Sequence, residues 1–231
     1  MKRFILSACA GLAAVAAMAA PSLAADIPRP AYKAPVYVAP AFSWSGFYIG
    51  VNAGYGWGHS DWNNVPMGNV SLGTKGALVG GTVGYNLQTG NFVFGVEGDI
   101  SASWMNGASQ GGAAGTVCIG PNSCETVNNW LATGRGRIGW AWDRFMPYIT
   151  GGASGGNIKA TANSGGSVDK TKLGWVVGAG LEWAFTGNWS TKLEYLYTDL
   201  GNITCEASAC GVETTVSLKT NIVRAGVNYR F

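Results

Sequence analysis

The stretch LGWVVGAGLEWAF, residues 173–185, alternates between two kinds of side chain at every position. Successive side chains of a β-strand point to opposite faces, so this alternation predicts a strand with one apolar face and one small or polar face. Glu182 and three glycines lie on the second face. The apolar face is formed by Leu173, Trp175, Val177, Ala179, Leu181, Trp183 and Phe185.

Seven further segments repeat this pattern, at 47–57, 76–87, 92–104, 130–142, 147–158, 189–197 and about 217–231. Short turns follow three of the strands, at 89–91, 143–146 and 186–188, whereas about 58–73, 105–128, 158–171 and 199–216 are expected to be long polar loops. Alternating short and long connections are typical of outer-membrane barrels, and closure of the barrel leaves no unpaired strand edge in lipid. We therefore predict an all-β, eight-stranded antiparallel transmembrane β-barrel over residues 46–231.

Two N-terminal segments differ in composition from the predicted barrel. Lys2 and Arg3, an apolar run and a Ser-Leu-Ala ending predict a signal peptide over residues 1–24. Residues 25–45 contain four prolines, which predicts an extended periplasmic tail. The remaining chain has no run of 18 apolar residues and little net charge, so neither helical membrane spans nor nucleic-acid binding is expected.

Tryptophans gather near the ends of the predicted strands, which suggests two aromatic girdles at the membrane interfaces. The outer girdle is expected to contain Trp57, Trp104, Trp130 and Trp175, and the inner girdle Trp140, Trp142, Trp183 and Trp189. A soluble lipocalin-like barrel is the alternative, and it would have to bury these rings and expose the charges.

The charged residues of the strands share the face opposite the aromatic one, so we expect them to point into the lumen. They are Glu97, Asp99, Arg135, Arg137, Glu182, Lys192, Glu194 and Arg224. If Trp104 faces Trp130, the register places Glu97 opposite Arg137 and Asp99 opposite Arg135. The lumen of an eight-stranded barrel is narrow enough for side chains to fill. The same residues therefore fit either a charge-balanced plug or a narrow path for ions or solutes.

Two small groups of residues in the predicted loops are candidate sites. The exported chain keeps four cysteines, and their spacing predicts local disulfides joining Cys118 to Cys124 and Cys205 to Cys210. The run His59-Ser60-Asp61 offers a base, a nucleophile and a carboxylate, but three adjacent side chains on a loop are not positioned for catalysis. We expect no enzymatic activity, no cofactor and no metal site.

Three motifs resemble the outer-membrane immunogenic protein family of Gram-negative bacteria, whose barrel is similar to the OmpA transmembrane domain. They are WSGFYIGVNAGYGWG at 44–58, GRGRIGWAWDRFMPYITGG at 134–152 and the final VNYRF. The resemblance implies antigenic surface loops and, in some members, a porin-like role. It also implies that Tyr229 and Phe231 belong to the signal read by the barrel-assembly machinery.

These observations together predict an integral surface protein of the Gram-negative outer membrane with a structural role in the envelope. The expected partners are outer-membrane lipid, lipopolysaccharide and, during biogenesis, the barrel-assembly machinery. The long loops are expected outside the cell and the N-terminal tail in the periplasm. A narrow porin and an exported ligand-binding barrel are the alternatives, and the sequence leaves substrate and oligomeric state open.

Overall fold

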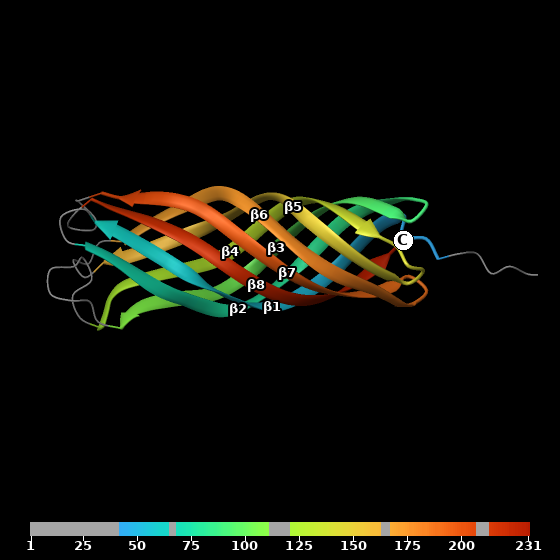
Figure 1. The fold of residues 1–231 in the computed structure, drawn as a ribbon. Helices are drawn as coiled ribbons and strands as arrows, with labels where there is room; N and C mark the ends of the chain where they lie inside the picture. The colour runs from blue at the N-terminus through green and yellow to red at the C-terminus, as the bar shows by residue number, and fades with distance from the viewer. Residues whose placement is uncertain (1–41, 65–67, 111–120, 163–166, 207–212) are drawn as a thin grey trace, which may run out of the picture. The chain divides into compact units, whose positions relative to one another are not determined.

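The computed structural model describes residues 42–64, 68–110, 121–162, 167–206 and 213–231. Within these ranges the chain forms one closed barrel of eight antiparallel strands, in which β1 also pairs with β8 (Figure 1). The predicted fold class is therefore confirmed. The strands are β1 (Gly46–Asn64), β2 (Gly68–Thr89), β3 (Phe92–Gln110), β4 (Pro121–Trp140), β5 (Phe145–Ala162), β6 (Ser167–Thr186), β7 (Trp189–Cys205) and β8 (Thr214–Arg230).

The predicted signal peptide, the predicted tail as far as residue 41, and Cys118 and Cys210 lie outside the described residues. The backbones of Cys124 and Cys205 lie at the ends of β4 and β7. The two disulfides therefore stay predictions. No helix in the described ranges is long and apolar enough to cross a membrane.

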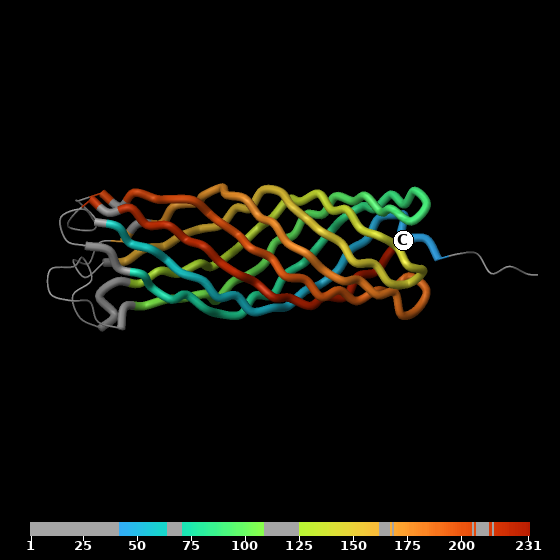
Figure 2. Tube along the Cα trace, in the orientation of Figure 1, coloured from blue at the N-terminus to red at the C-terminus, as the bar shows by residue number. Residues whose placement is uncertain are grey.

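Three tight turns connect strands at one end of the barrel, as the trace in Figure 2 shows. Gly90 and Gly187 have φ angles of 61° and 39°, a left-handed conformation that glycine adopts at little cost. In the third turn Asp143 takes this conformation with φ 51°, and Trp142 and Phe145 pair across it. Asp is among the residues that tolerate this region best.

The strands are 17 to 22 residues long, which corrects the prediction of long polar loops. Most of the residues assigned to loops continue the strands, and β1 runs on to Asn64. The period of two also continues, but its polarity inverts. On β1 the outward side chains change from Trp57 to His59, whereas the inward ones change from polar Asn52 to buried Trp62.

The barrel therefore has two parts with opposite chemistry. Near the tight turns it is apolar outside, where Phe47, Ile49 and Val51 are each more than half exposed, and charged inside. Beyond the outer tryptophans it is polar outside and apolar inside, and we call this part the outer extension. Its core continues down to the charged lumen and consists of Trp62, Leu72, Leu78, Met105, Leu131, Ile158, Ala160, Val176, Leu196, Leu200, Ile203, Val216, Leu218 and Ile222.

Irregular pairing marks the region where the two parts meet. The register shifts between Ala102 and Met105 on β3, between Val127 and Leu131 on β4, and between Asp199 and Asn202 on β7. At the β4 shift, the side-chain oxygen of Asn157 accepts the backbone N–H groups of residues 129 and 130, at 2.9 and 3.3 Å. Such bulges increase local twist and bend a strand, so they redirect its side chains.

The register of β3 and β4 differs by two residues from the one expected. Glu97 pairs with Arg135, Asp99 pairs with Thr133, and Trp130 pairs with Ala102 instead of Trp104. The tryptophan pairing assumed from the sequence is wrong, because Trp130 already pairs with Ala102 before the register of β3 shifts. A slip of two keeps each side chain on its face, so the charges still point inward.

The residues just before β1 close the end of the barrel near the tight turns. Trp44 is 1% exposed, its backbone N–H donates to Gln88 Oε1 at 2.7 Å, and its indole N–H donates to the Asp143 carbonyl at 3.0 Å. The Arg230 guanidinium lies 4.4 Å from the centre of the Phe42 ring. Residues 42–45, which the sequence placed at the end of the tail, thus form a cap that connects the ends of β2 and β8 with the turn between β4 and β5.

Candidate functional site

Eight charged side chains from five of the strands meet inside the barrel, in the part that is apolar outside. Glu97 and Asp99 come from β3, Arg135 and Arg137 from β4, Glu182 from β6, Lys192 and Glu194 from β7, and Arg224 from β8. Each of these eight residues is at most 7% exposed. We call them the charge cluster.

Glu97 is the centre of the charge cluster. Its carboxylate accepts two hydrogen bonds from Lys192 Nζ, at 2.9 and 3.0 Å, and one from Tyr48 Oη at 2.8 Å. It also forms ion pairs with Arg135 and, at 3.7 Å, with Arg137 and Arg224. Glu97 is thus the carboxylate that contacts all four cations of the cluster, so its loss would remove a negatively charged partner from each of them.

Asp99 and Glu194 share the other contacts of two arginines. Arg224 donates to Asp99 through both terminal nitrogens, at 2.9 and 3.0 Å, and through Nε to Glu194 at 2.7 Å. Arg135 donates to Asp99 and to Glu194 at 2.9 Å each. Since β3, β4, β7 and β8 are not all neighbours, these bonds cross the lumen and connect opposite walls.

Arg137 occupies the level nearest the tight turns. It donates to Glu182 at 3.0 Å and to the Asn86 side chain at 2.9 Å. Its guanidinium also lies over the rings of Tyr48 and Tyr148, at 4.8 and 5.2 Å from their centres, a favourable cation–π geometry. Sequence reasoning did not assign these tyrosines to the site, although both lie on the same face of their strands as the charges.

The charge cluster is balanced and nearly saturated with hydrogen bonds. Every carboxylate binds at least one cation, and every cation binds at least one carboxylate. The cluster atoms without a partner in the described residues are Arg135 Nε and one terminal nitrogen of Arg137. An ion entering this network would have to displace an existing ion pair, which is costly in a low-dielectric interior. The arrangement favours a fixed plug over a polar channel.

Apolar layers cover the charge cluster on both sides. Toward the outer extension, four side chains at most 4% exposed form the first layer of the core of that extension, which we call the outer core. They are Leu131, Val176, Leu196 and Ile222. Toward the tight turns, a second cluster closes the lumen, and it contains Trp44, Val93, Ala141, Met146, Tyr148 and Ala184. No three His, Cys, Asp or Glu side chains in the described ranges are arranged to hold a metal ion.

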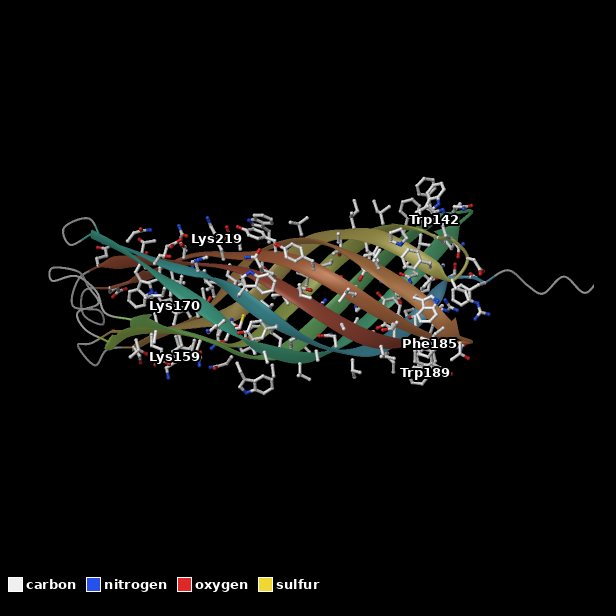
Figure 3. All side chains as sticks on the ribbon, turned by 60° about the horizontal axis from the view of Figure 1, so that its bottom comes forward. Trp142, Lys159, Lys170, Phe185, Trp189 and Lys219 are labelled. Carbon is white, nitrogen blue, oxygen red and sulfur yellow. The ribbon has the colours of Figure 1, made fainter. Side chains whose placement is uncertain are left out.

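The predicted girdle tryptophans point outward. Seven are between 39% and 61% exposed, and Trp130 is partly buried. Figure 3 shows Trp142 and Trp189 with Phe185 at one end of the barrel and Lys159, Lys170 and Lys219 at the other. At the end of β8, Tyr229 packs between Trp189 and Phe231, with ring centres 5.1 and 5.2 Å away.

The run His59-Ser60-Asp61 does not form a catalytic arrangement. It lies within β1 and not in a loop, so its side chains alternate between the two faces. Ser60 is buried and shares a hydrogen bond with Thr126 at 3.1 Å, while His59 points outward. A base on one side of a strand cannot activate a hydroxyl on the other side.

A closed antiparallel barrel with an apolar exterior, aromatic rings at the ends of the apolar surface and charges in the lumen defines an integral outer-membrane barrel. A soluble lipocalin-like barrel has the reverse arrangement, so the structure does not support that alternative.

Comparison with known proteins agrees with this class. The family model described as outer membrane protein beta-barrel domain matches residues 8–231. The 31 kDa outer-membrane immunogenic protein of Brucella melitensis is 38% identical over 251 residues, which cover 100% of each chain. The 25 kDa outer-membrane immunogenic protein of Brucella abortus is 33% identical over 221 residues, which cover 95% of each.

Among solved structures, the outer membrane protein OprG from Pseudomonas aeruginosa superposes with a TM-score of 0.52 at 14% identity. The match covers 81% of this chain and 96% of OprG, and it shows likeness of fold alone. The chain belongs to the outer membrane protein beta-barrel domain family. The resemblance inferred from the three motifs is confirmed, and so is the outer-membrane location.

Proposed function

We propose that this protein is a non-enzymatic structural component of the outer membrane, whose closed barrel holds a rigid, antigenic surface structure above the lipid. The single observation that carries the proposal is the filled lumen. The charge cluster, in which all eight side chains are paired, lies between two buried apolar clusters. A barrel sealed at three successive levels is suited to anchoring and poorly suited to transport.

The proposed orientation places the outer extension outside the cell and the tight turns in the periplasm. Short periplasmic turns are usual in outer-membrane barrels, which supports this orientation. From Trp57 to Asn64, β1 extends by seven residues, or roughly 23 Å along the strand at about 3.3 Å per residue. The antigenic surface would then include strands as well as the segments that connect them.

Two partners belong to this proposal. The apolar exterior requires lipid, and a surface facing outward in this membrane would meet lipopolysaccharide. The aromatic end of β8, Tyr229 and Phe231, is the segment we propose is read by the barrel-assembly machinery. On the outside of the folded barrel Phe231 packs on Tyr229, which in turn packs on Trp189, so replacing Phe231 by alanine should slow assembly more than it destabilises the finished barrel.

The alternative, a narrow porin, is tested by planar-bilayer conductance of refolded protein whose heat-modifiable mobility proves that it is folded. The experiment compares wild-type protein with an Arg135→Ala, Arg137→Ala double variant in the same bilayers. A known porin serves as the control for insertion. Silent wild-type bilayers support the closed lumen. Steady wild-type channels whose conductance changes in the variant would refute it and assign transport to the charge cluster.

The structural role needs a separate measurement. A deletion strain should become more sensitive to detergents, and expression of wild-type protein should restore resistance. A deletion strain with unchanged detergent resistance would count against a structural role, even if the lumen proved not to conduct.

A further inference from the structure

The border between apolar and polar exterior is sharp on three adjacent strands, β8, β1 and β2. On β8 the outward residues change from Val223 to Asn221 and then Lys219, and on β1 they change from Trp57 to His59. On β2 the residue after Ala77 toward the outer extension is Lys75. The Asn221 side chain accepts the Tyr195 hydroxyl at 2.6 Å, so hydrogen-bonding groups begin at this level.

Basic side chains gather directly beyond this border. His59 is the register partner of Lys219 on β8, and Trp57 is the register partner of Lys75 on β2. All three basic residues are exposed. The two lysines lie two strands and two residues apart, about 12 Å between Cα atoms from standard sheet spacings. We call Lys75, His59 and Lys219 the basic sector.

The centre of the basic sector is open. Gly73 on β2 is the register partner of His59, and no heavy atom lies within 4 Å of a Cβ atom placed on Gly73. Neither lysine forms an ion pair with another described residue. Of the nearby acids, Asp61 lies farther from the apolar border, and Asp199, opposite Lys219, uses Oδ1 to accept the backbone N–H of residue 201 at 2.8 Å.

We propose that the basic sector binds phosphate groups on the headgroup of the outer-leaflet glycolipid. Lipid phosphates lie just outside the hydrocarbon layer, and long lysine side chains at a membrane border extend toward that level. The lysine ammonium groups supply positive charge, and the ammonium and imidazole N–H groups can donate hydrogen bonds to phosphate oxygens. The space over Gly73 leaves room for the ligand. The inference rests on the proposed orientation, which places this border in the outer leaflet.

The test uses the refolded full chain in detergent micelles, titrated calorimetrically with bisphosphorylated lipid A. A Lys75→Gln, Lys219→Gln variant should bind about fivefold more weakly, since it loses two exposed charge-assisted contacts. The matched control, Lys159→Gln with Lys170→Gln, removes the same charge from exposed lysines of β5 and β6 and should stay within about twofold of wild type. Heat-modifiable mobility must be unchanged in both variants.

Two further ligands identify the source of the phosphate. Dephosphorylated lipid A should bind the wild type about as weakly as lipid A binds the lysine variant, and phosphatidylglycerol should not show the lysine dependence. Equal losses in the control variant, undiminished binding of dephosphorylated lipid A, or the same dependence with phosphatidylglycerol would each overturn the proposal. Lipid A binding and bilayer conductance are independent measurements. A failure of the lipid-binding proposal is therefore distinguishable from a failure of the closed-lumen proposal.

Discussion

Replacing Glu97 by glutamine should destabilise the barrel strongly. Glu97 is 4% exposed, and its carboxylate is the partner of Lys192 at 2.9 Å as well as a partner of Arg135. The substitution keeps the shape but leaves one buried positive charge without a counter-charge. Removing one partner of a buried ion pair costs about 3 to 5 kcal/mol, and we expect a loss of this size in the free energy of unfolding.

A second variant tests whether charge balance is the cause. Lys192 pairs with Glu97 among the described residues. Glu97→Gln combined with Lys192→Met therefore restores the charge balance of the cluster, with three acids and three bases. The double variant should recover most of the lost stability, with a coupling free energy of about 2 kcal/mol or more. Asp169→Asn is the control, because Asp169 is exposed on β6, and it should change stability by less than about 0.5 kcal/mol.

Unfolding would be followed by tryptophan fluorescence in urea, with barrels reconstituted in lipid vesicles. The chain contains 10 tryptophans, and seven of those in the predicted girdles are exposed on the outer surface, so unfolding changes their environment. A cost below about 1 kcal/mol for Glu97→Gln would show that water screens the charges. The filled-lumen reasoning, and with it the proposal of a closed lumen, would then be wrong.

Three further predictions test other parts of the barrel. Trp44→Ala removes a 1% exposed ring from the cap and should cost about 3 kcal/mol, seen as a lower temperature for the heat-induced mobility shift; an unchanged temperature would mean that the cap adds nothing. Ile203→Asn puts an amide into the outer core and should expose the outer extension to protease while the membrane part stays protected, so an unchanged digestion pattern would contradict this core. The new methyl group of Gly134→Ala meets no atom within 4 Å, so this variant should be as stable as wild type. The methyl group of Gly174→Ala overlaps the Asp199 carbonyl oxygen and should lower the free energy of unfolding by about 2 kcal/mol or more. Equal urea midpoints for the two variants would argue against the β6–β7 packing.

Local sequence pattern determined the number of strands, their approximate positions and the turns that join them. Period-two alternation is a property of each segment by itself, and two of the tight turns have glycine where the backbone takes a positive φ angle that glycine adopts at little cost. The same pattern separated an aromatic face from a charged face. A slip of two residues keeps every side chain on its face, so this separation survived the wrong register between Glu97 and Arg137.

Only the tertiary structure decided which charges meet. Arg224 binds Asp99, and Lys192 binds Glu97, across the lumen between strands that are not neighbours. Such contacts depend on closure of the barrel and on register shifts, neither of which a single strand specifies. The cap formed by Trp44 is another contact between distant segments, since its partners are Gln88 at the end of β2 and Asp143 in the turn between β4 and β5.

The outer extension shows the limit of sequence reasoning most clearly. Residues such as His59 and Asp61 suggested a loop because polar side chains replaced the apolar outward face of β1. The strand in fact continues with its polarity inverted, because its surroundings change from lipid to water outside and its interior from charged to apolar. An alternating pattern determines that a strand has two different faces, but only the assembled barrel decides which face points inward.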